Sequence, residues 1–136
     1  MDARWVVDFA ELRLAAAPEY GGKSANLGEM TGAGFPVPPG FSVGQSAYLT
    51  AMESAGVRSR LYDGRVPEEG MSEAELMSLA AELSSTVAGV EMPSRLREEV
   101  LAHYRSLGPD VPVAVRSSAP AEDAGDTSFA GIHESY

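Results

Sequence analysis

The stretch "VPVAVRSSAPAEDAGDTSFAGIHESY", residues Val111–Tyr136, decides how the rest of the chain is interpreted. It opens with the near-continuous apolar run "VPVAVRS", Val111–Ser117, which is typical of a strand buried on both faces. Arg116 lies at the end of this run, where an isolated buried charge would be very costly. The stretch therefore predicts a buried strand with an anionic group beside its end.

Two partners for Arg116 fit its position. A structural interpretation pairs its guanidinium with Glu122 or Asp123, which follow a few residues later. A functional interpretation gives it a phosphate, because the guanidinium fork matches phosphate oxygens. The residues themselves leave both interpretations open.

A second candidate anion site lies at "APEYGGKS", Ala17–Ser24, which nearly fits the phosphate-loop pattern but has Ala17 in place of the first glycine. A phosphate loop follows a buried strand, and the preceding "ELRLAAA" is no such strand, so a phosphate-loop NTPase is disfavoured. The narrower prediction is that Gly21 and Gly22 present Lys23 at a helix N-terminus that favours an anion. The alternative is a lysine that is merely solvated after a turn.

Composition restricts the classes of partner. The chain has 136 residues, with 44% hydrophobic and 22% charged, as in ordinary globular domains. A net charge of −10 argues against nucleic-acid and anionic-membrane surfaces. No apolar run approaches the roughly 20 residues of a membrane span. The N-terminal "MDARWVVDF" has an early acid and no apolar core, so we do not expect it to be a secretory signal. Cysteine is absent. We therefore expect a cytoplasmic protein.

Hydrophobic periodicity predicts an α+β fold, helix-rich, with short strands at both ends, in one incomplete domain over residues 1–136. The expected elements are a strand over Arg4–Phe9, a loop over Pro18–Gly22, a helix from Lys23 to a stop at Gly34, a proline-rich turn over Phe35–Phe41, a helix ending at Gly56, a connection over Tyr62–Met71, a helix opened by a capping box of Ser72 and Glu75, a helix after Pro93, and the strand Val111–Ser117. The expected apolar faces include Met30, Tyr48, Leu76, Leu79, Leu96 and Leu101.

The closing "SFAGIHESY" offers further candidates. Gly131 would allow a ligand close to the backbone or mark a strand bulge, and Ser135 could donate to a phosphate or simply lie on a surface strand. We expect His103 and His133 to be structural, because neither belongs to a metal-ligand pattern. No metal site is assigned to the acidic "AEDAGD" segment.

Four segments in order carry a resemblance: "WVVDFAEL", "GGKSANLGEM", "GFPVPPGFSV" and "VAVRSSAPAEDAGDTSFAG". Together they resemble the N-terminal nucleotide-binding region of the phosphoenolpyruvate synthase (pyruvate, water dikinase) family. Rifampicin phosphotransferases and pyruvate phosphate dikinases share this region. The resemblance spans essentially the whole chain and implies the first part of an ATP-grasp fold.

The resemblance also implies an activity for the parent protein. ATP, with Mg²⁺, would give its β-phosphoryl group to a histidine on a separate swivelling domain, with release of AMP and phosphate. Lys23 and Arg116 match phosphate-contacting positions of the family, and Gly131 and Ser135 fall on nucleotide-contacting positions of a covering loop. Pro120 departs from the family's usual threonine, which stiffens the turn and removes one hydroxyl.

The family's magnesium ligands, adenine pocket and transfer histidine are expected beyond Tyr136, so this chain alone is expected to be inactive. The final acceptor would be pyruvate or, alternatively, an antibiotic such as a rifamycin. A third hypothesis is non-enzymatic: a partial domain that binds a protein partner or completes another chain's sheet. If the chain is an excised fragment, its unpaired last strand predicts dimerisation or poor solubility.

Overall fold

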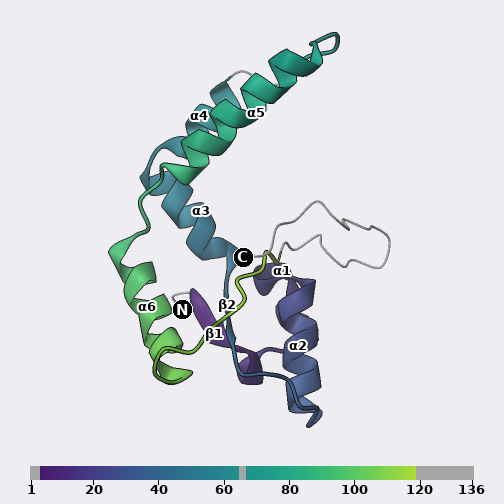
Figure 1. Cartoon of the computed structure of the whole chain (residues 1–136), viewed down its shortest axis with the longest axis vertical. Coiled ribbons are helices and arrows are strands. Elements are labelled where there is room, and N and C mark those ends of the chain that lie inside the picture. Colours follow the sequence, from purple (N-terminus) through teal and green to yellow (C-terminus); the bar gives the residue numbers. More distant parts are fainter. Residues whose placement is uncertain (1–3, 65–66, 119–136) are drawn as a thin grey trace. The chain divides into compact units, whose positions relative to one another are not determined.

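The structure is a computed structural model that describes residues 4–64 and 67–118 (Figure 1). Its elements, in chain order, are β1 (Val6–Asp8), the 3₁₀ helices η1 (Phe9–Glu11) and η2 (Leu14–Ala16), α1 (Ala17–Tyr20), α2 (Gly22–Gly32), β2 (Phe41–Val43), α3 (Gln45–Ser54), α4 (Val57–Asp63), α5 (Glu73–Ala88) and α6 (Ser94–Ser106). These elements agree with the predicted helix-rich α+β class. The chain divides into two compact units, residues 1–47 with 94–136 and residues 48–93.

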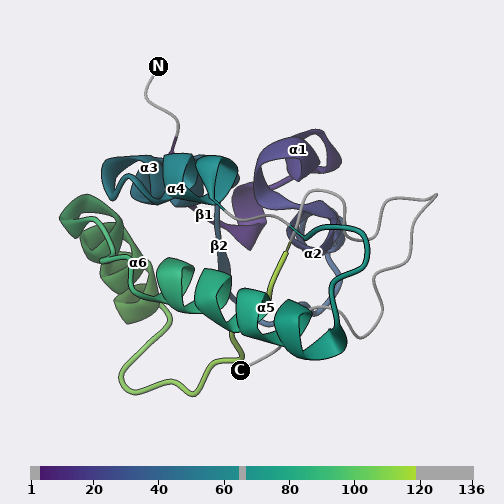
Figure 2. The ribbon, with the colours of Figure 1, turned by 90° about the horizontal axis from the view of Figure 1, so that it is seen from above.

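The first unit is built on an antiparallel pair of short strands. Val6 of β1 pairs with Val43 of β2, and Asp8 pairs with Phe41. Figures 1 and 2 show α2 and α6 on opposite sides of this pair. The strand expected over Arg4–Phe9 is therefore confirmed over its central residues, where β-branched side chains favour extended backbone.

The core of the first unit joins segments far apart in the sequence. Val6, Ala47 and Leu96 form one buried cluster, so α6 packs on β1 and on the start of α3. Trp5 packs against the same cluster, and its ring lies 4.4 Å from the guanidinium carbon of Arg95 on α6. This packing ties the C-terminal part of the unit to its first strand.

The second unit contains most of α3, together with α4 and α5. Ser72 and Glu75 form the predicted capping box at the start of α5, with the Ser72 hydroxyl accepting from the Glu75 N–H and the Glu75 carboxylate accepting from the Ser72 N–H. Met52 and Val57 belong to the core of this unit. The sequence did not predict α4, because a helix of 7 residues carries too few apolar positions to show a period.

The predicted loop over Pro18–Gly22 is wrong, because residues 17–20 form α1. Pro18 occupies the first turn of this helix. A proline is tolerated there, since the first N–H groups of a helix have no partner within it. The proline therefore begins a helix at this position instead of interrupting one.

The predicted buried strand over Val111–Ser117 is also wrong for the residues that the structure describes. Val113 is 49% exposed and Val115 is 60% exposed, and only Arg116 forms an isolated β-bridge. The sheet within the described ranges contains β1 and β2 alone. An apolar run becomes a buried strand only where neighbouring strands and helices cover it, and no element of the described residues buries Val113 or Val115.

Several expected core positions are partly exposed. Leu79 and Leu96 are buried as predicted. In contrast, the exposed fraction is 40% or more at four other expected positions, namely Met30, Tyr48, Leu76 and Leu101. Helix α2 instead buries the small face of Ser24, Ala25 and Gly28. Small residues let this helix approach its neighbours closely, which an apolar period does not reveal.

Candidate functional site

The backbone turns sharply at Gly21, between α1 and α2. Gly21 has φ +80°, in the region that favours glycine, and a Cβ atom there would lie 2.8 Å from the carbonyl carbon of Ser118. A side chain would therefore collide with backbone that is distant in sequence. The glycine allows the segment ending at Ser118 to lie directly against this turn.

Helix α2 begins immediately after this turn, and its N-cap residue, Gly21, has no side chain that could cap it. The first N–H groups of an α-helix lack partners within the helix, and the helix dipole places partial positive charge there. Gly22 and Lys23 are the first two residues of α2. The local backbone is therefore of the kind that favours an anion.

Lys23 lies at this helix N-terminus and is half-buried. Its Nζ donates to the carbonyl oxygen of Ser117 at 3.1 Å, although the two residues are 94 positions apart. This contact does not fit the alternative of a lysine that is merely solvated after a turn. The structure thus brings together the two candidate anion-binding segments that the sequence predicted separately.

Arg116 precedes the carbonyl group that Lys23 contacts, and its side chain is exposed. Its predicted partners Glu122 and Asp123 lie outside the described residues. The same holds for Gly131 and Ser135. The structure therefore places Lys23 next to the Arg116 segment, and the roles of the other candidates stay predictions.

The sequence did not indicate that a set of serine side chains holds the N-terminus of α2 against residues 116–118. This contact region is called the Lys23 junction below. The Ser118 hydroxyl donates to the Tyr20 carbonyl oxygen at 3.0 Å, and the Ser24 hydroxyl donates to the Ser118 hydroxyl at 3.2 Å. Ser24 also lies 2.9 Å from the hydroxyl of Ser42 on β2. The only sequence signal was the presence of small hydroxyl residues beside each predicted cation, in "GGKS" and "VRSS".

The Glu19 side chain contacts the start of α3. Its Oε1 accepts hydrogen bonds from the N–H of Ser46 at 2.9 Å and from the Ser46 hydroxyl at 2.5 Å. Glu19 therefore caps the first turn of α3. Helical residues precede the two glycines here, so the strand that a phosphate loop requires is absent from the described residues.

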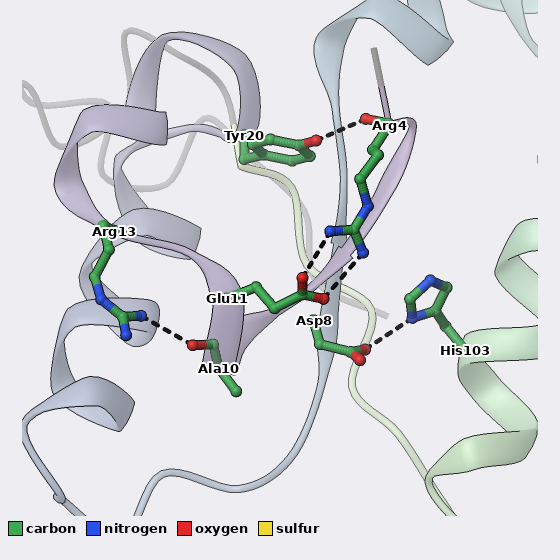
Figure 3. Close-up of polar contacts among 7 residues, drawn as sticks. All are labelled: Arg4, Asp8, Ala10, Glu11, Arg13, Tyr20 and His103. Atoms are coloured by element: carbon green, nitrogen blue, oxygen red, sulfur yellow. Dashed lines mark hydrogen bonds and ion pairs between the residues drawn. The ribbon is translucent and has the colours of Figure 1, made fainter. Parts of the chain in front are cut away.

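A second polar cluster lies near β1 (Figure 3). Arg4 makes two hydrogen bonds to the Glu11 carboxylate, at 2.6 and 2.9 Å, and this contact lowers the pKa of Glu11. The Tyr20 hydroxyl donates to the Arg4 carbonyl oxygen at 2.6 Å. Burial is the main cause of a raised pKa at Tyr20. These contacts join β1 to η1 and α1.

His103 completes this cluster from the α6 side. Its Nδ1 lies 2.8 Å from Oδ1 of Asp8, and its ring centroid lies 5.5 Å from that of Phe41. Both contacts fasten α6 to the strand pair, as Figure 3 shows for Asp8. The predicted structural role of His103 agrees with this arrangement, whereas His133 lies outside the described residues.

No group of three or more His, Asp and Glu side chains within residues 4–64 and 67–118 could hold a metal ion. In the same ranges, no helix has the length and apolar character that a membrane crossing needs. The acidic "AEDAGD" segment lies outside the described residues.

Comparison with known families identifies the class of protein. Residues 17–136 match the family described as "Pyruvate phosphate dikinase, AMP/ATP-binding domain". The match covers most of the chain and includes α1, the Gly21 turn, Lys23 and Arg116. The chain therefore belongs to this family, as the sequence resemblance predicted.

Curated relatives are consistent with this family. The chain is 38% identical over its whole length to the phosphoenolpyruvate synthase of Aeropyrum pernix, of which it covers 17%. It is 35% identical to a probable phosphoenolpyruvate synthase of Staphylothermus marinus, over 99% of this chain and 17% of the relative. It is 34% identical over its whole length to the enzyme of Neisseria meningitidis serogroup B, of which it covers 18%. The chain thus spans less than a fifth of the length of these relatives.

Proposed function

We propose that this chain forms the phosphate-binding part of the ATP site in a phosphoenolpyruvate synthase-like phosphotransferase. One observation carries the proposal: Lys23, at the N-terminus of α2, is held against the segment that bears Arg116. Family membership supports an adenine nucleotide as the ligand. The single domain over residues 1–136 would then be the first part of an ATP-grasp module.

The chemistry of the residues fits the triphosphate of ATP. The Lys23 ammonium acts as a point charge beside the N–H groups of α2, and the Arg116 guanidinium offers a planar fork to phosphate oxygens. Both groups would neutralise charge on a phosphoryl group in transfer and fix its direction. Gly131 and Ser135 are proposed to cover the same phosphates.

The rest of the reaction requires other parts of the parent protein. Mg²⁺ would neutralise phosphate charge when bound, with ligands supplied by residues outside this chain. The phosphoryl group would pass to a histidine on a separate domain of the parent chain, and then to pyruvate. The names of the relatives support this acceptor, and no finding supports a rifamycin as the acceptor.

Substitution of the two cations tests this function. Lys23→Ala and Arg116→Ala should each lower the rate of AMP formation by the intact parent at least about tenfold, the scale of a lost charge-assisted phosphate contact. Arg13→Ala is the matched control, because Arg13 donates to the Ala10 carbonyl oxygen at 2.9 Å, on a different element. Near-normal rates in both site variants would overturn the proposal.

The isolated chain provides a second test. We expect the 136 residues alone to form no AMP and to bind Mg-ATP weakly, because metal ligands and the adenine pocket are proposed to lie elsewhere. Calorimetry with Mg-ATP measures this binding. Affinity in the low micromolar range for the isolated chain would contradict the proposed division of the site.

Self-association of the isolated chain is a related proposal. Val113 and Val115 are largely exposed, and apolar extended segments without a neighbouring strand can pair with another chain. We expect the apparent mass in light scattering to rise with concentration. A monomer at every concentration would exclude this pairing.

A further inference from the structure

Three serine hydroxyls and one carbonyl group form a continuous line through the first unit. It runs from Ser42 on β2 to Ser24 on α2, with hydroxyl oxygens 2.9 Å apart. It continues from Ser24 to Ser118 over 3.2 Å and ends at the Tyr20 carbonyl oxygen over 3.0 Å. The line therefore connects the sheet, α2, the Arg116 segment and the end of α1.

The direction of this line follows from the chemistry of its last member. A carbonyl oxygen can only accept, so Ser118 donates its single hydroxyl proton to Tyr20. Ser118 must then accept from Ser24, and Ser24 must accept from Ser42. One arrangement of protons satisfies every contact, so the geometry defines a single directed chain of hydrogen bonds.

The burial of two hydroxyls in this line of hydrogen bonds indicates that they position secondary-structure elements. Ser24 is 5% exposed and Ser42 is 7% exposed. A buried hydroxyl is unfavourable unless it is hydrogen-bonded, whereas alanine would fill nearly the same space without that requirement. The paired hydroxyls of Ser24 and Ser42 therefore contribute little to the buried apolar area. Their hydrogen bond instead fixes the alignment of α2 with β2.

At its other end, the line of hydrogen bonds holds the segment that bears Arg116. Ser118 is held by Tyr20 and Ser24, and the neighbouring Ser117 carbonyl oxygen accepts from Lys23. The absence of a side chain at Gly21 lets this segment approach the turn. Two consecutive residues after Arg116 are therefore anchored to the helix that presents Lys23.

We propose that Ser118 is a positioning residue for the phosphate site. Through Tyr20 and Ser24 it holds Arg116 in a fixed register with Lys23, and it need not touch the nucleotide itself. This inference rests on the proposed function, because it assigns a role within the same ATP site. It predicts that a neutral hydroxyl sets the affinity of the site for phosphate.

Mg-ATP binding to the intact parent, measured by calorimetry, tests the role of this hydroxyl. Ser118→Ala should weaken affinity about fivefold, the scale of lost hydrogen bonds, whereas Ser118→Thr keeps the hydroxyl and should stay within about twofold. Ser106→Ala is the matched control, because the Ser106 hydroxyl also donates to a backbone carbonyl, that of His103 at 2.6 Å. The control should bind like the unsubstituted protein.

A double-mutant cycle distinguishes positioning from general stabilisation. If Ser118 acts by placing Arg116 relative to Lys23, the effect of Ser118→Ala should depend on Lys23. In a protein that already carries Lys23→Ala, Ser118→Ala should weaken the affinity for Mg-ATP by less than about twofold. A merely structural residue would give the same loss in both backgrounds. Equal losses would therefore contradict the proposal.

A second variant covers the case in which Ser118→Ala does not fold. Ser24→Ala combined with Ser42→Ala removes the two buried hydroxyls of the hydrogen-bond line, while Ser118 keeps its bond to Tyr20. We expect this variant to bind Mg-ATP about threefold more weakly, with an unchanged circular dichroism spectrum. Unchanged binding in this variant overturns the proposal.

The Lys23 and Arg116 variants distinguish failure of the proposed function from failure of the Ser118 proposal. If Lys23→Ala loses at least about tenfold in affinity while Ser118→Ala loses nothing, the proposed function stands and the role of Ser118 is wrong. If Lys23→Ala and Arg116→Ala both leave binding unchanged, the proposed function is wrong, and the inference about Ser118 fails with it.

Discussion

The first unit contains two polar clusters that anchor a cation in different ways. Arg4 lies against a carboxylate, with two hydrogen bonds to Glu11. Lys23 donates to a neutral carbonyl oxygen, that of Ser117, and neutral hydroxyls hold the same segment at Ser118. A contact with a carboxylate neutralises charge, whereas a contact with a carbonyl group only orients it.

This difference separates a scaffold from a candidate site. The Arg4 cluster joins β1 to η1 and α1 through partners that satisfy one another. The Lys23 junction orients a cation at a helix N-terminus next to a second cationic segment. Because a helix N-terminus favours an anion, we propose ligand binding at the Lys23 junction and structural support from the Arg4 cluster.

The largest expected effect comes from Gly21→Ala. An alanine there would adopt φ +80° and ψ 156°, a region used essentially by glycine alone, at a cost of about 1–3 kcal/mol, and would also collide with the Ser118 backbone. We expect Mg-ATP affinity of the parent to fall at least about tenfold, because the Arg116 segment is displaced.

Gly34→Ala is the matched control for this change. Gly34 has φ +83°, and no atom of the described residues lies within 4 Å of the added Cβ. It should cost about 1–2 kcal/mol of unfolding free energy and leave affinity unchanged. Equal affinities in the two variants would break the link between the turn and the site.

A smaller effect is expected for Glu19→Gln. This change removes a charged acceptor from the first turn of α3 and should lower the free energy of unfolding by about 1 kcal/mol, measured in urea. Glu53→Gln is the control, because Glu53 is 59% exposed in a surface pair with Arg58 and should cost less than about 0.5 kcal/mol. Equal costs for both would show that Glu19 does not cap α3.

The smallest effect concerns pH and the Arg4 cluster. The Arg4 hydrogen bond lowers the pKa of Glu11 in the folded state. The stability it contributes is therefore present above the unfolded pKa, about 4.3, and is lost as pH falls through the lower folded pKa.

Glu11→Gln should accordingly cost at most about 1 kcal/mol at pH 7, because both side chains are about half exposed. The difference from the unsubstituted protein should shrink on acidification below about pH 4. Urea unfolding across this range measures it, and a difference that grows at low pH would contradict the assignment.

Local signals made part of the fold predictable. The capping box of Ser72 and Glu75 lies within three positions and defined the start of α5 correctly. The glycine pair before Lys23 indicated a helix N-terminus, which α2 confirms. Each of these features depends on neighbours in sequence, and a sequence displays such neighbours directly.

Features that depend on distant partners were missed or mispredicted. Ser24 and Ser118 are 94 positions apart, and no spacing rule pairs them. Glu19 lay in the predicted loop over Pro18–Gly22, and its acceptor role was not foreseen because it exists only once α3 begins beside it. The valines of Val111–Val115 indicated a buried strand, but burial requires covering elements that the described residues do not supply.

The site itself was predictable in type but not in assembly. Lys23 and Arg116 each stood out from residue chemistry and from resemblance to a family. Their joining through Ser117 and Ser118 needed the structure, since it depends on a close backbone approach at Gly21.

Lys23 is the single lysine of this chain, which makes one measurement especially direct. Labelling of the intact parent with an amine-reactive ester, followed by mass spectrometry of the Lys23 peptide, reports access to this ammonium group. We predict that saturating Mg-ATP slows labelling of Lys23 several-fold, whereas adenosine, which lacks phosphates, does not. Equal labelling rates with and without Mg-ATP would contradict the assignment of Lys23 to a phosphate site.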